Sequence, residues 1–281
     1  MTSHKSARQQ AGSDRQGLAS LIFRVLADFF RQTATILWVE TVKIRRDPFS
    51  LFTRAVQPVL WLGVFGTVMA RTRAIPTGSV GYLEFMVPGV LAQSVLFLSI
   101  FYGISLIWEK DLGILSKYLA SPAYRPALVT GKALAAGVRA LSQAVVVCVL
   151  GLLLGARLVL TPSSILGVLF FLMLGAALFS TFSLVIACLV KTRERFMGIG
   201  QVLTMPLFFA SNAIYPLAMM PPWLKTISTM NPLSYQVDAL RALMIENSVS
   251  SFGFATDFSV QAVFLVIVIA IATRIFPTIV R

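Results

Sequence analysis

The sequence predicts an all-α integral membrane protein with six transmembrane helices. Of its 281 residues, 57% are hydrophobic and 12% are charged, and the mean hydropathy is +0.82. A soluble domain carries about 25% charged residues, so this composition is typical of a chain that lies mostly in lipid. Six mostly apolar stretches reach the length of about 20 residues that a helix needs to cross a bilayer. They lie at about 51–70, 85–107, 133–154, 164–190, 196–216 and 257–276.

The cationic residues indicate which loops face the cytoplasm. With the N-terminus inside, the inner segments hold 18 of the 24 Lys and Arg residues and the outer segments hold 5. Because Lys and Arg concentrate in cytoplasmic loops, we expect both termini in the cytoplasm. The net charge of +13 then reflects topology rather than a nucleic-acid groove.

The one remaining cation, Arg139, lies within the third predicted span. Arg139 could contact a substrate or take part in gating. Alternatively, its side chain could extend to the lipid headgroups on the inner side. Its distance of about six residues, or about 9 Å of helix, from the inner boundary favours the headgroups.

Three segments make up the predicted domain organisation. Residues 1–17 are polar and predicted to be disordered. Residues 18–46 repeat apolar side chains at helical spacing with charged residues on another face, which predicts an amphipathic helix in the membrane interface. Residues 47–281 form the transmembrane domain. Because the first apolar run begins behind this long basic tail, we expect no cleaved signal peptide.

Residues 108–132 carry the densest charge in the middle of the chain, with four cations and two acids. Leu112, Leu115 and Leu119 give one apolar stripe at helical spacing, and prolines follow it. The pattern predicts a short amphipathic helix at the inner face of the membrane that offers one side to a cytoplasmic partner. An ordinary solvated loop is the alternative.

Residues 217–246 lie on the predicted outer side and are too apolar for an ordinary loop. A short apolar turn at Trp223 is followed by Asn231 and Pro232, which are a typical cap and first-turn residue of a second helix. Both pieces are too short to cross the bilayer. We therefore expect two helices that re-enter or lie on the outer leaflet and cap a central cavity.

The 108–132 segment resembles the cytoplasmic signature of ABC-2 type transporter permeases. The matching elements fall on Glu109, Lys110, Asp111, Gly113, Leu115, Leu119, Ser121, Pro122, Arg125, Gly131 and Lys132. In that family the segment is the coupling helix that docks into the ATPase subunit. The resemblance implies that eight of these residues couple the permease to the ATPase subunit. They are Glu109, Lys110, Asp111, Gly113, Leu115, Leu119, Pro122 and Arg125.

The 217–246 segment also resembles this family, and its motif is longer. The matches fall on Pro216, Pro222, Trp223, Leu224, Asn231, Pro232, Leu233, Ser234, Tyr235, Val237, Asp238, Ala239, Leu240 and Arg241. The residues expected to build the cap are Pro216, Pro222, Trp223, Asn231, Pro232, Tyr235, Asp238 and Arg241. A weaker third match is the PGVL sequence at 88–91. The chain is most similar to the daunorubicin-resistance branch of the family.

Residues that could perform chemistry are scarce. Gly131-Lys132 lacks both a Gly five residues earlier and a following Ser or Thr, so it is no phosphate-binding loop. The single histidine, His4, rules out a Ser/His/Asp set. We expect a chain that is no enzyme and binds no cofactor or metal. A separate ATPase subunit, as in the family, would hold ATP and magnesium and supply the energy.

Polar and aromatic residues within the spans are the candidates for contact with a transported molecule. Span two carries Gln93, Ser94, Ser99, Tyr102 and Ser105. They could line a pathway, although hydrogen bonds between helices explain them equally well. Phenylalanines such as Phe97 could contact an aromatic substrate, although packing or lipid contact is favoured.

The resemblance implies the permease subunit of an ABC exporter in a bacterial plasma membrane. Its other partners would be the lipid bilayer and a second permease protomer, identical or paralogous. We expect an amphipathic drug or lipid as cargo, with export of a lipid-linked glycan as an alternative on the same fold. A membrane channel or scaffold without a motor is the alternative from another class. A channel should show a pore-lining polar stripe or charge ring, and the sequence has none.

Overall fold

The computed structural model describes residues 27–39, 41–42, 53, 55–73, 75–78, 80–114, 117, 120, 124–190 and 192–275, and every regular element among them is helical. After a helical N-terminal segment (27–39 and 41–42), the elements are the π-helix η1 (Val59–Gly66), α3 (Thr67–Thr72), α4 (Tyr82–Asp111), α6 (Arg125–Leu153), α7 (Pro162–Leu189), α8 (Arg193–Phe209), the 3-10 turn η2 (Leu217–Met219), α9 (Pro222–Met230), α10 (Pro232–Met244) and α11 (Phe254–Ile275). The predicted all-α class is confirmed.

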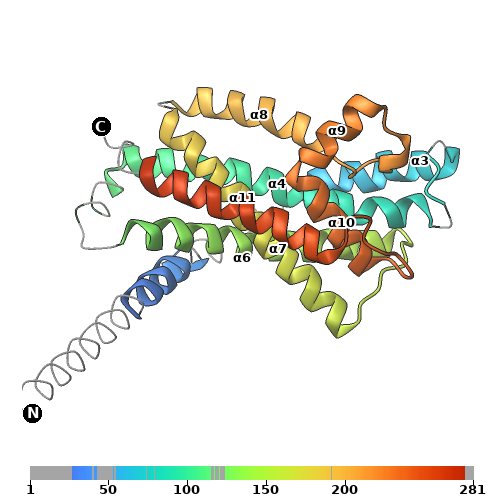
Figure 1. Ribbon diagram of the computed structural model, residues 1–281, viewed down its shortest axis with the longest axis horizontal. Helices are drawn as coiled ribbons and strands as arrows, with labels where there is room; N and C mark the ends of the chain where they lie inside the picture. Colours follow the sequence, from blue (N-terminus) through green and yellow to red (C-terminus); the bar gives the residue numbers. More distant parts are fainter. Residues whose placement is uncertain are drawn as a thin grey trace, which may run out of the picture.

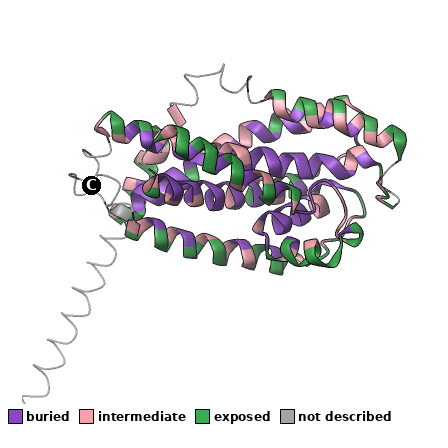
Figure 2. Cartoon of the chain, turned by 90° about the horizontal axis from the view of Figure 1, so that it is seen from above, coloured by how far each residue is buried: buried purple, intermediate pink, exposed green. Residues whose placement is uncertain are grey.

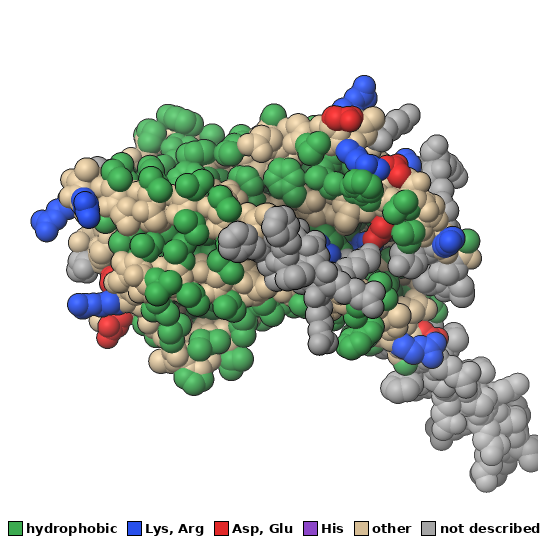
Figure 3. Space-filling view, turned by 180° about the vertical axis from the view of Figure 1, so that it is seen from behind, with side chains coloured by type: hydrophobic (Ala, Val, Ile, Leu, Met, Phe, Trp, Pro, Cys, Tyr) green, Lys and Arg blue, Asp and Glu red, His purple; other side chains and the backbone are tan. Residues whose placement is uncertain are grey.

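The long helices run side by side along one axis (Figure 1). We call the end of the bundle at Trp108 and Lys132 the coupling end, and the end at Tyr82 and Leu153 the cap end. Figure 1 shows the N-terminal segment at the coupling end and α3, α9 and α10 at the cap end. Charged side chains gather at the two ends of the face in Figure 3, with a hydrophobic band between them. This distribution fits a bundle surrounded by lipid.

Four helices are long and apolar enough to cross a membrane: α4, α6 from Pro126, α7 and α11. They coincide with the spans predicted at 85–107, 133–154, 164–190 and 257–276. The stretches predicted at 51–70 and 196–216 correspond to η1 with α3 and to α8, which has only 17 residues. Their crossing of the bilayer stays a prediction.

Helix α4 lies at the centre of the bundle. It packs against α6, α7, α8 and α10, and 72% of its most apolar window is buried. Only 11% of the corresponding window of α11 is buried, so this helix faces outward. Figure 2 shows the same contrast, with buried residues on the inner helices and exposed ones on the outer helices. A helix that is apolar on all sides belongs in a core, and α4 occupies that place.

Two helix boundaries differ from the predicted spans for one physical reason. Helix α4 continues to Asp111 and α6 already begins at Arg125, so both extend beyond the apolar stretches. The extra turns bring together Glu109 and Lys132, which lie inside the protein. Hydrophobicity alone therefore predicts the end of α4 too early in the chain and the start of α6 too late.

The cap segment forms two short helices, and α10 is the buried one. Asn231 accepts a hydrogen bond from the backbone N–H of Leu233 at 3.0 Å, and Pro232 follows it, as the sequence predicts. Helix α10 packs against α4, α7 and α11, whereas most of α9 is exposed. Their re-entry into the outer leaflet stays a prediction.

A serine links α10 to α11 at the cap end. The Ser250 hydroxyl lies 2.8 Å from a carboxylate oxygen of Asp238 and 2.8 Å from one of Asp257. Both acids are buried, at 3% and 0% exposure. The backbone N–H of Phe252 also donates to Asp238, at 3.1 Å. Because the serine hydroxyl has one hydrogen, it donates to one of the two acids at a time, while the Phe252 N–H also serves Asp238.

We expect Ser250→Ala to destabilise the protein by about 1–3 kcal/mol, because a buried carboxyl group loses a hydrogen-bond donor. Thermal unfolding of the purified protein in detergent micelles measures the effect. The neighbouring exposed Ser251 provides the control variant, Ser251→Ala, which should unfold like the wild type. Equal unfolding temperatures for both variants would contradict the link.

Candidate functional site

A cavity of about 570 Å³ lies between α4, α6 and the residues that precede η1. This volume is in the range of about 300–1,000 Å³ that is typical of pockets for drug-sized ligands. Its wall combines aromatic, aliphatic and hydrogen-bonding side chains with one guanidinium. The lining residues are Thr53, Gln57, Ser94, Phe97, Leu98, Phe101, Tyr102, Ile104, Ser105, Trp108, Arg139 and Gln143.

One face of α4 supplies most of this wall. Phe97, Phe101, Ser105 and Trp108 follow one another at intervals of three or four residues, so their side chains share a side of the helix. The rings of Phe97 and Phe101 lie 6.2 Å apart between centroids. The Ser105 hydroxyl donates to the carbonyl of Tyr102 at 2.7 Å within its own helix. The wall therefore presents aromatic surface with polar groups spaced along it.

Arg139 contributes the charged group of the wall. It is the middle residue of α6, with equal numbers of helical residues on either side. Its guanidinium lies over the ring of Tyr102, 4.6 Å from the centroid, in a cation–π contact. A side chain that reaches the inner headgroups, which the sequence favours, stays a prediction, while the place of Arg139 in the cavity wall fits the alternative of a substrate or gating contact. An aromatic ring on the facing helix, which sequence spacing does not reveal, holds the guanidinium inside the bundle.

Lys132 and Glu109 form a buried ion pair next to the cavity. The Lys132 ammonium lies 2.7 Å from the Glu109 carboxylate, and the two side chains are only 2% and 6% exposed. Removing two charges from water is costly, and their mutual attraction offsets this cost only at such close range. The pair joins α4 to α6. Glu109 thus points into the protein. Its expected role in coupling to an ATPase subunit stays a prediction.

Asp111 and Arg193 connect α4 to α8 at the same end. Their side chains form an ion pair at 2.5 Å, and both are partly exposed. The Arg193 guanidinium also lies 3.5 Å from the centroid of the Trp108 ring, which lines the cavity. Arg193 therefore joins the start of α8 to Asp111 and to Trp108 of the cavity wall.

Gly113 follows the end of α4 at Asp111. Its φ of +68° lies in the left-handed region, which disfavours residues with a Cβ. Its N–H donates to the carbonyl of Lys110 at 2.9 Å. This geometry explains why a glycine stands at this point of the motif. Leu115, Leu119 and Pro122 lie outside the described residues, and α6 then begins at Arg125.

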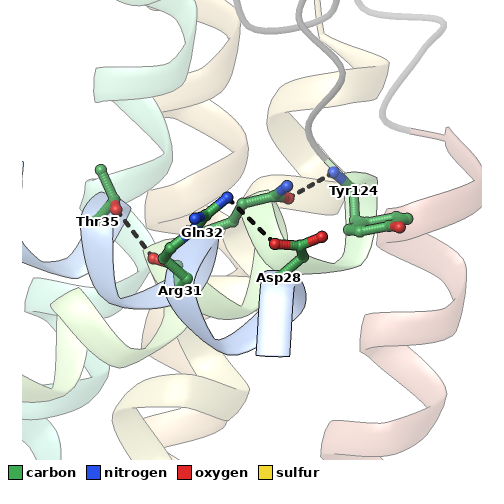
Figure 4. A network of polar contacts seen from close by, with 5 residues as sticks. All are labelled: Asp28, Arg31, Gln32, Thr35 and Tyr124. Atoms are coloured by element: carbon green, nitrogen blue, oxygen red, sulfur yellow. Dashed lines mark hydrogen bonds and ion pairs between the residues drawn. The ribbon is translucent and has the colours of Figure 1, made fainter. Parts of the chain in front are cut away.

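The N-terminal segment docks against the start of α6 (Figure 4). The backbone N–H of Tyr124 donates to the Gln32 side chain at 2.8 Å, and the hydroxyls of Thr33 and Thr130 lie 3.4 Å apart. An added Cβ at Gly131 would lie 2.8 Å from the Cβ of Ile36, so only glycine permits this approach. The described part of the predicted amphipathic helix, at 27–39 and 41–42, therefore contacts the second half of the coupling motif.

The predicted cap residues hold the cap end together through backbone contacts. The Asn231 amide donates to the carbonyl of Leu207 at 2.6 Å, and the Tyr235 hydroxyl donates to that of Thr229 at 2.6 Å. The structure thus brings Asn231, Pro232, Tyr235, Asp238 and Arg241 onto one buried region around α10. Pro216, Pro222 and Trp223 lie on the neighbouring turn and α9.

Arg241 is the buried cation of this region. Its guanidinium donates to the carbonyl of Asn212 at 2.9 Å and lies 3.7 Å from the centroid of the Phe85 ring. Burial lowers the pKa of Arg241 to about 10, while the nearby Asp238 carboxylate raises it. The side chain therefore stays protonated at neutral pH and fastens α10 to both α4 and the turn after α8.

Sequence analysis missed several lining residues, namely Thr53, Gln57, Gln143 and Trp108. The regular spacing of Phe97, Phe101, Ser105 and Trp108 along one side of α4 could have indicated this face. No pattern within the sequence could have shown that α6 presents Arg139 and Gln143 to it. Among the described residues, no three His, Cys, Asp or Glu side chains gather as metal ligands.

The fold defines a class of protein, a helical membrane protein with a cavity between its helices. The family model for the ABC-2 type transporter matches residues 31–245. The chain belongs to the ABC-2 type transporter family and is a permease subunit of an ABC transporter.

Curated relatives agree with this assignment. The chain is 32% identical over 209 residues to a transport permease, ycf38, of Cyanophora paradoxa, covering 74% of this chain and 72% of the relative. It is 27% identical over 212 residues to the daunorubicin resistance ABC transporter permease protein DrrB1 of Streptomyces coeruleorubidus, covering 75% and 74%. It is 27% identical over 215 residues to the doxorubicin resistance permease protein DrrC of Mycobacterium tuberculosis, covering 73% and 74%. The predicted resemblance to daunorubicin-resistance permeases is confirmed.

Gly131→Ala should detach the N-terminal segment from α6, because the new methyl group would overlap Ile36. A cysteine pair at positions 33 and 130 reports the contact through disulfide formation, with Cys148 and Cys188 replaced by Ala. We expect the disulfide yield to fall severalfold. Gly198→Ala is the matched control, since nothing lies within 4 Å of a Cβ at that helical glycine. An unchanged yield in Gly131→Ala would exclude the close approach.

The ion pair can be tested with a double-mutant cycle of Glu109→Gln and Lys132→Met. Each single variant leaves a buried charge and should cost about 3–5 kcal/mol, whereas the double variant should cost much less than their sum. Unfolding in detergent gives the coupling energy. The partly exposed ion pair of Asp111 and Arg193 serves as the control. A second cycle with Asp111→Asn and Arg193→Gln should give a coupling energy of about 0–1 kcal/mol. Additive effects at Glu109 and Lys132 would refute a direct interaction.

Proposed function

We propose that this chain is the membrane-spanning half of an exporter that moves an amphipathic drug or lipid out of a bacterial cell, with both termini in the cytoplasm. The observation that supports it is the cavity beside the coupling end. Its wall offers aromatic surface for an apolar body and Gln, Ser, Thr and Arg side chains for a polar group. Such mixed walls suit amphipathic ligands.

The two ends of the bundle differ in a way that fits export. At the cap end, the buried helix α10 and its contacts to α4, α7 and α11 fill the space between the helices. At the coupling end, the cavity extends along α4 as far as Trp108, three residues from the end of that helix. Cargo would enter from the coupling end or its lipid leaflet and leave when the cap end opens.

The motor would be a separate ATPase subunit that binds ATP and magnesium and docks on residues 108–132, in part through Lys110, Asp111 and Arg125. This segment connects α4 directly to α6, the two helices that build the cavity wall. A displacement of the segment would therefore move both walls. The N-terminal segment contacts α6 at Thr130 and would form a second part of the docking surface.

A second permease protomer, identical or paralogous, would complete the path. The outward-facing α11, of which little is buried, leaves apolar surface for lipid or for that protomer. Export of a lipid-linked glycan is the second candidate function. The observation that favours it is the row formed by Phe97, Phe101 and Trp108, since sugar rings pack well on aromatic faces.

Gly113→Ala tests the coupling role. The substitution forces a Cβ into a left-handed backbone and should redirect the chain that leaves α4. We expect the variant to insert normally but to lose most of its binding to a co-expressed ABC ATPase subunit, and to stimulate its ATP hydrolysis several times less. Copurification and phosphate release measure the two effects. Arg125→Glu should act in the same direction.

Gly78→Ala is the matched control for this experiment. Gly78 has a φ of +71°, has nothing within 4 Å of a Cβ, and precedes α4 at the cap end. Gly78→Ala and Gly113→Ala therefore carry the same backbone penalty, but Gly78 lies at the opposite end of the bundle from the predicted coupling segment. If both variants bind the ATPase like the wild type, or if no ATPase binds at all, a channel or scaffold without a motor becomes the better explanation.

A further inference from the structure

Two buried acids on different helices meet at one serine of the cap end. Asp238 on α10 and Asp257 in the first turn of α11 are 3% and 0% exposed. One carboxyl oxygen of each acid lies 2.8 Å from the Ser250 hydroxyl oxygen, which also accepts from the backbone N–H of Gly253 at 2.7 Å. These contacts use the hydroxyl group completely, since it has one hydrogen and two lone pairs.

The number of hydrogens at this serine points to one more proton. Its hydroxyl can donate its single hydrogen to only one of the two acids. The other acid, at the same distance of 2.8 Å, then meets a lone pair of the hydroxyl oxygen. Such a contact is favourable only when that acid is protonated and donates. The geometry thus favours one proton shared by Asp238 and Asp257, which we call the carboxyl pair.

The two members of the carboxyl pair have unequal surroundings. Asp238 also accepts from the backbone N–H of Phe252 at 3.1 Å, and its charge acts on the nearby guanidinium of Arg241. The second oxygen of Asp257 is buried and has no hydrogen-bond partner in the described part of the chain. A buried charged oxygen without a partner is costly, whereas the carbonyl oxygen of a neutral acid costs much less. The shared proton therefore fits the Asp257 side of the serine.

The neighbouring elements add little positive charge around the carboxyl pair. In the segments that the structure describes, no Lys or Arg forms an ion pair with either acid. Helix α7 has no Asp, Glu, Lys or Arg, and α6 has none after Arg139. On α10, burial and the charge of Asp257 raise the pKa of Tyr235, so this phenol stays neutral. The other ionisable side chains in the cap-end parts of the packed elements are Tyr82 and Glu84 on α4, Cys148 on α6, Lys225 on α9 and Glu246 in the turn after α10.

We infer that the carboxyl pair and Ser250 form a proton-dependent contact, which joins the cap helix α10 to α11 while one proton is shared and loosens when that proton is lost. Loss of the proton places two negative charges on either side of one hydroxyl group, where they repel each other in the protein interior. Because the cap end is predicted to face outward, the pH outside the cell would set the strength of the contact. This contact is independent of the proposed function, since it needs neither an ATPase nor a cargo.

Infrared spectroscopy detects the shared proton directly. The C=O stretch of a protonated carboxyl group is recorded for the purified permease in a detergent without carbonyl groups, and exchange into D2O identifies the band by its shift. We expect the wild type to show this band at neutral pH and to lose most of it as the pH rises to about 9, because both members of a coupled pair then ionise. A wild type without the band at neutral pH would overturn the inference, and this result needs no variant.

Asp257→Asn assigns the band to the carboxyl pair. The amide has the shape of the protonated acid and can donate to Ser250, so the variant keeps the contact and has no proton to lose. It should lack the band that the wild type shows at neutral pH. Glu246→Gln is the matched control, since it removes an exposed acid in the turn after α10 and should keep the band. An undiminished band in Asp257→Asn would overturn the inference.

Thermal unfolding at several pH values tests the link between the helices. Aspartates of an unfolded chain ionise at about pH 4, so at neutral pH the folded pair binds one proton more than the unfolded chain. The stability of the fold therefore falls as the pH rises above neutral. Between about pH 7 and about pH 9, the unfolding temperatures of the wild type and of Glu246→Gln should fall by several degrees, and that of Asp257→Asn much less. Parallel curves for the wild type and Asp257→Asn would refute a contact that depends on the proton.

Sodium distinguishes a shared proton from a bound metal cation. Excess sodium chloride at alkaline pH, compared with choline chloride of equal ionic strength, should not restore the unfolding temperature of the wild type. The contact needs a donated hydrogen, which a metal ion does not supply. Recovery with sodium alone would indicate a cation site between the two carboxylates and would overturn the inference.

Discussion

The buried ion pair between Lys132 and Glu109 fixes the geometry on which the rest of the coupling end depends. Its 2.7 Å contact joins the last turn of α4 to the second turn of α6, the two helices that enclose the cavity. A charge at this depth is tolerated only with its partner in place, so the two helices cannot separate here without a large energetic cost. Tyr102 lies close to both Lys132 and Arg139, and thus connects the pair to the charged group of the cavity wall.

Cation–π contacts occur at both ends of the bundle, which otherwise differ in their polar contacts. At the cap end, side chains such as Asn231, Tyr235 and Arg241 donate to backbone carbonyls, and each contact fixes a turn or helix end. At the coupling end, ion pairs and a cation–π contact join α4 to α6 and α8.

Much of the fold followed from simple patterns, and particular residues show why. The apolar runs of α4, α6, α7 and α11 predicted four of the helices, since a bilayer requires long apolar helices. Asn231 with Pro232 predicted the start of α10, because capping depends on neighbouring residues alone. Gly113 of the predicted coupling motif has a left-handed backbone, which is a local requirement that a glycine meets. In contrast, no local pattern indicated the ion pair of Glu109, because its partner Lys132 lies 23 residues further along the chain.

The sequence by itself determined that this protein is a helical membrane permease of the ABC-2 family, since composition, helix length and local motifs carry that information. Only the tertiary structure decided which polar residues of the spans face a cavity and which face a neighbouring helix. Ser94 and Tyr102 line the cavity, while Gln93 and Ser99, on the same helix, are buried in the bundle. The contact between Arg139 and the ring of Tyr102 likewise follows from packing and not from sequence spacing. Such choices depend on which faces of distant helices meet, and that is a property of packing rather than of any one segment.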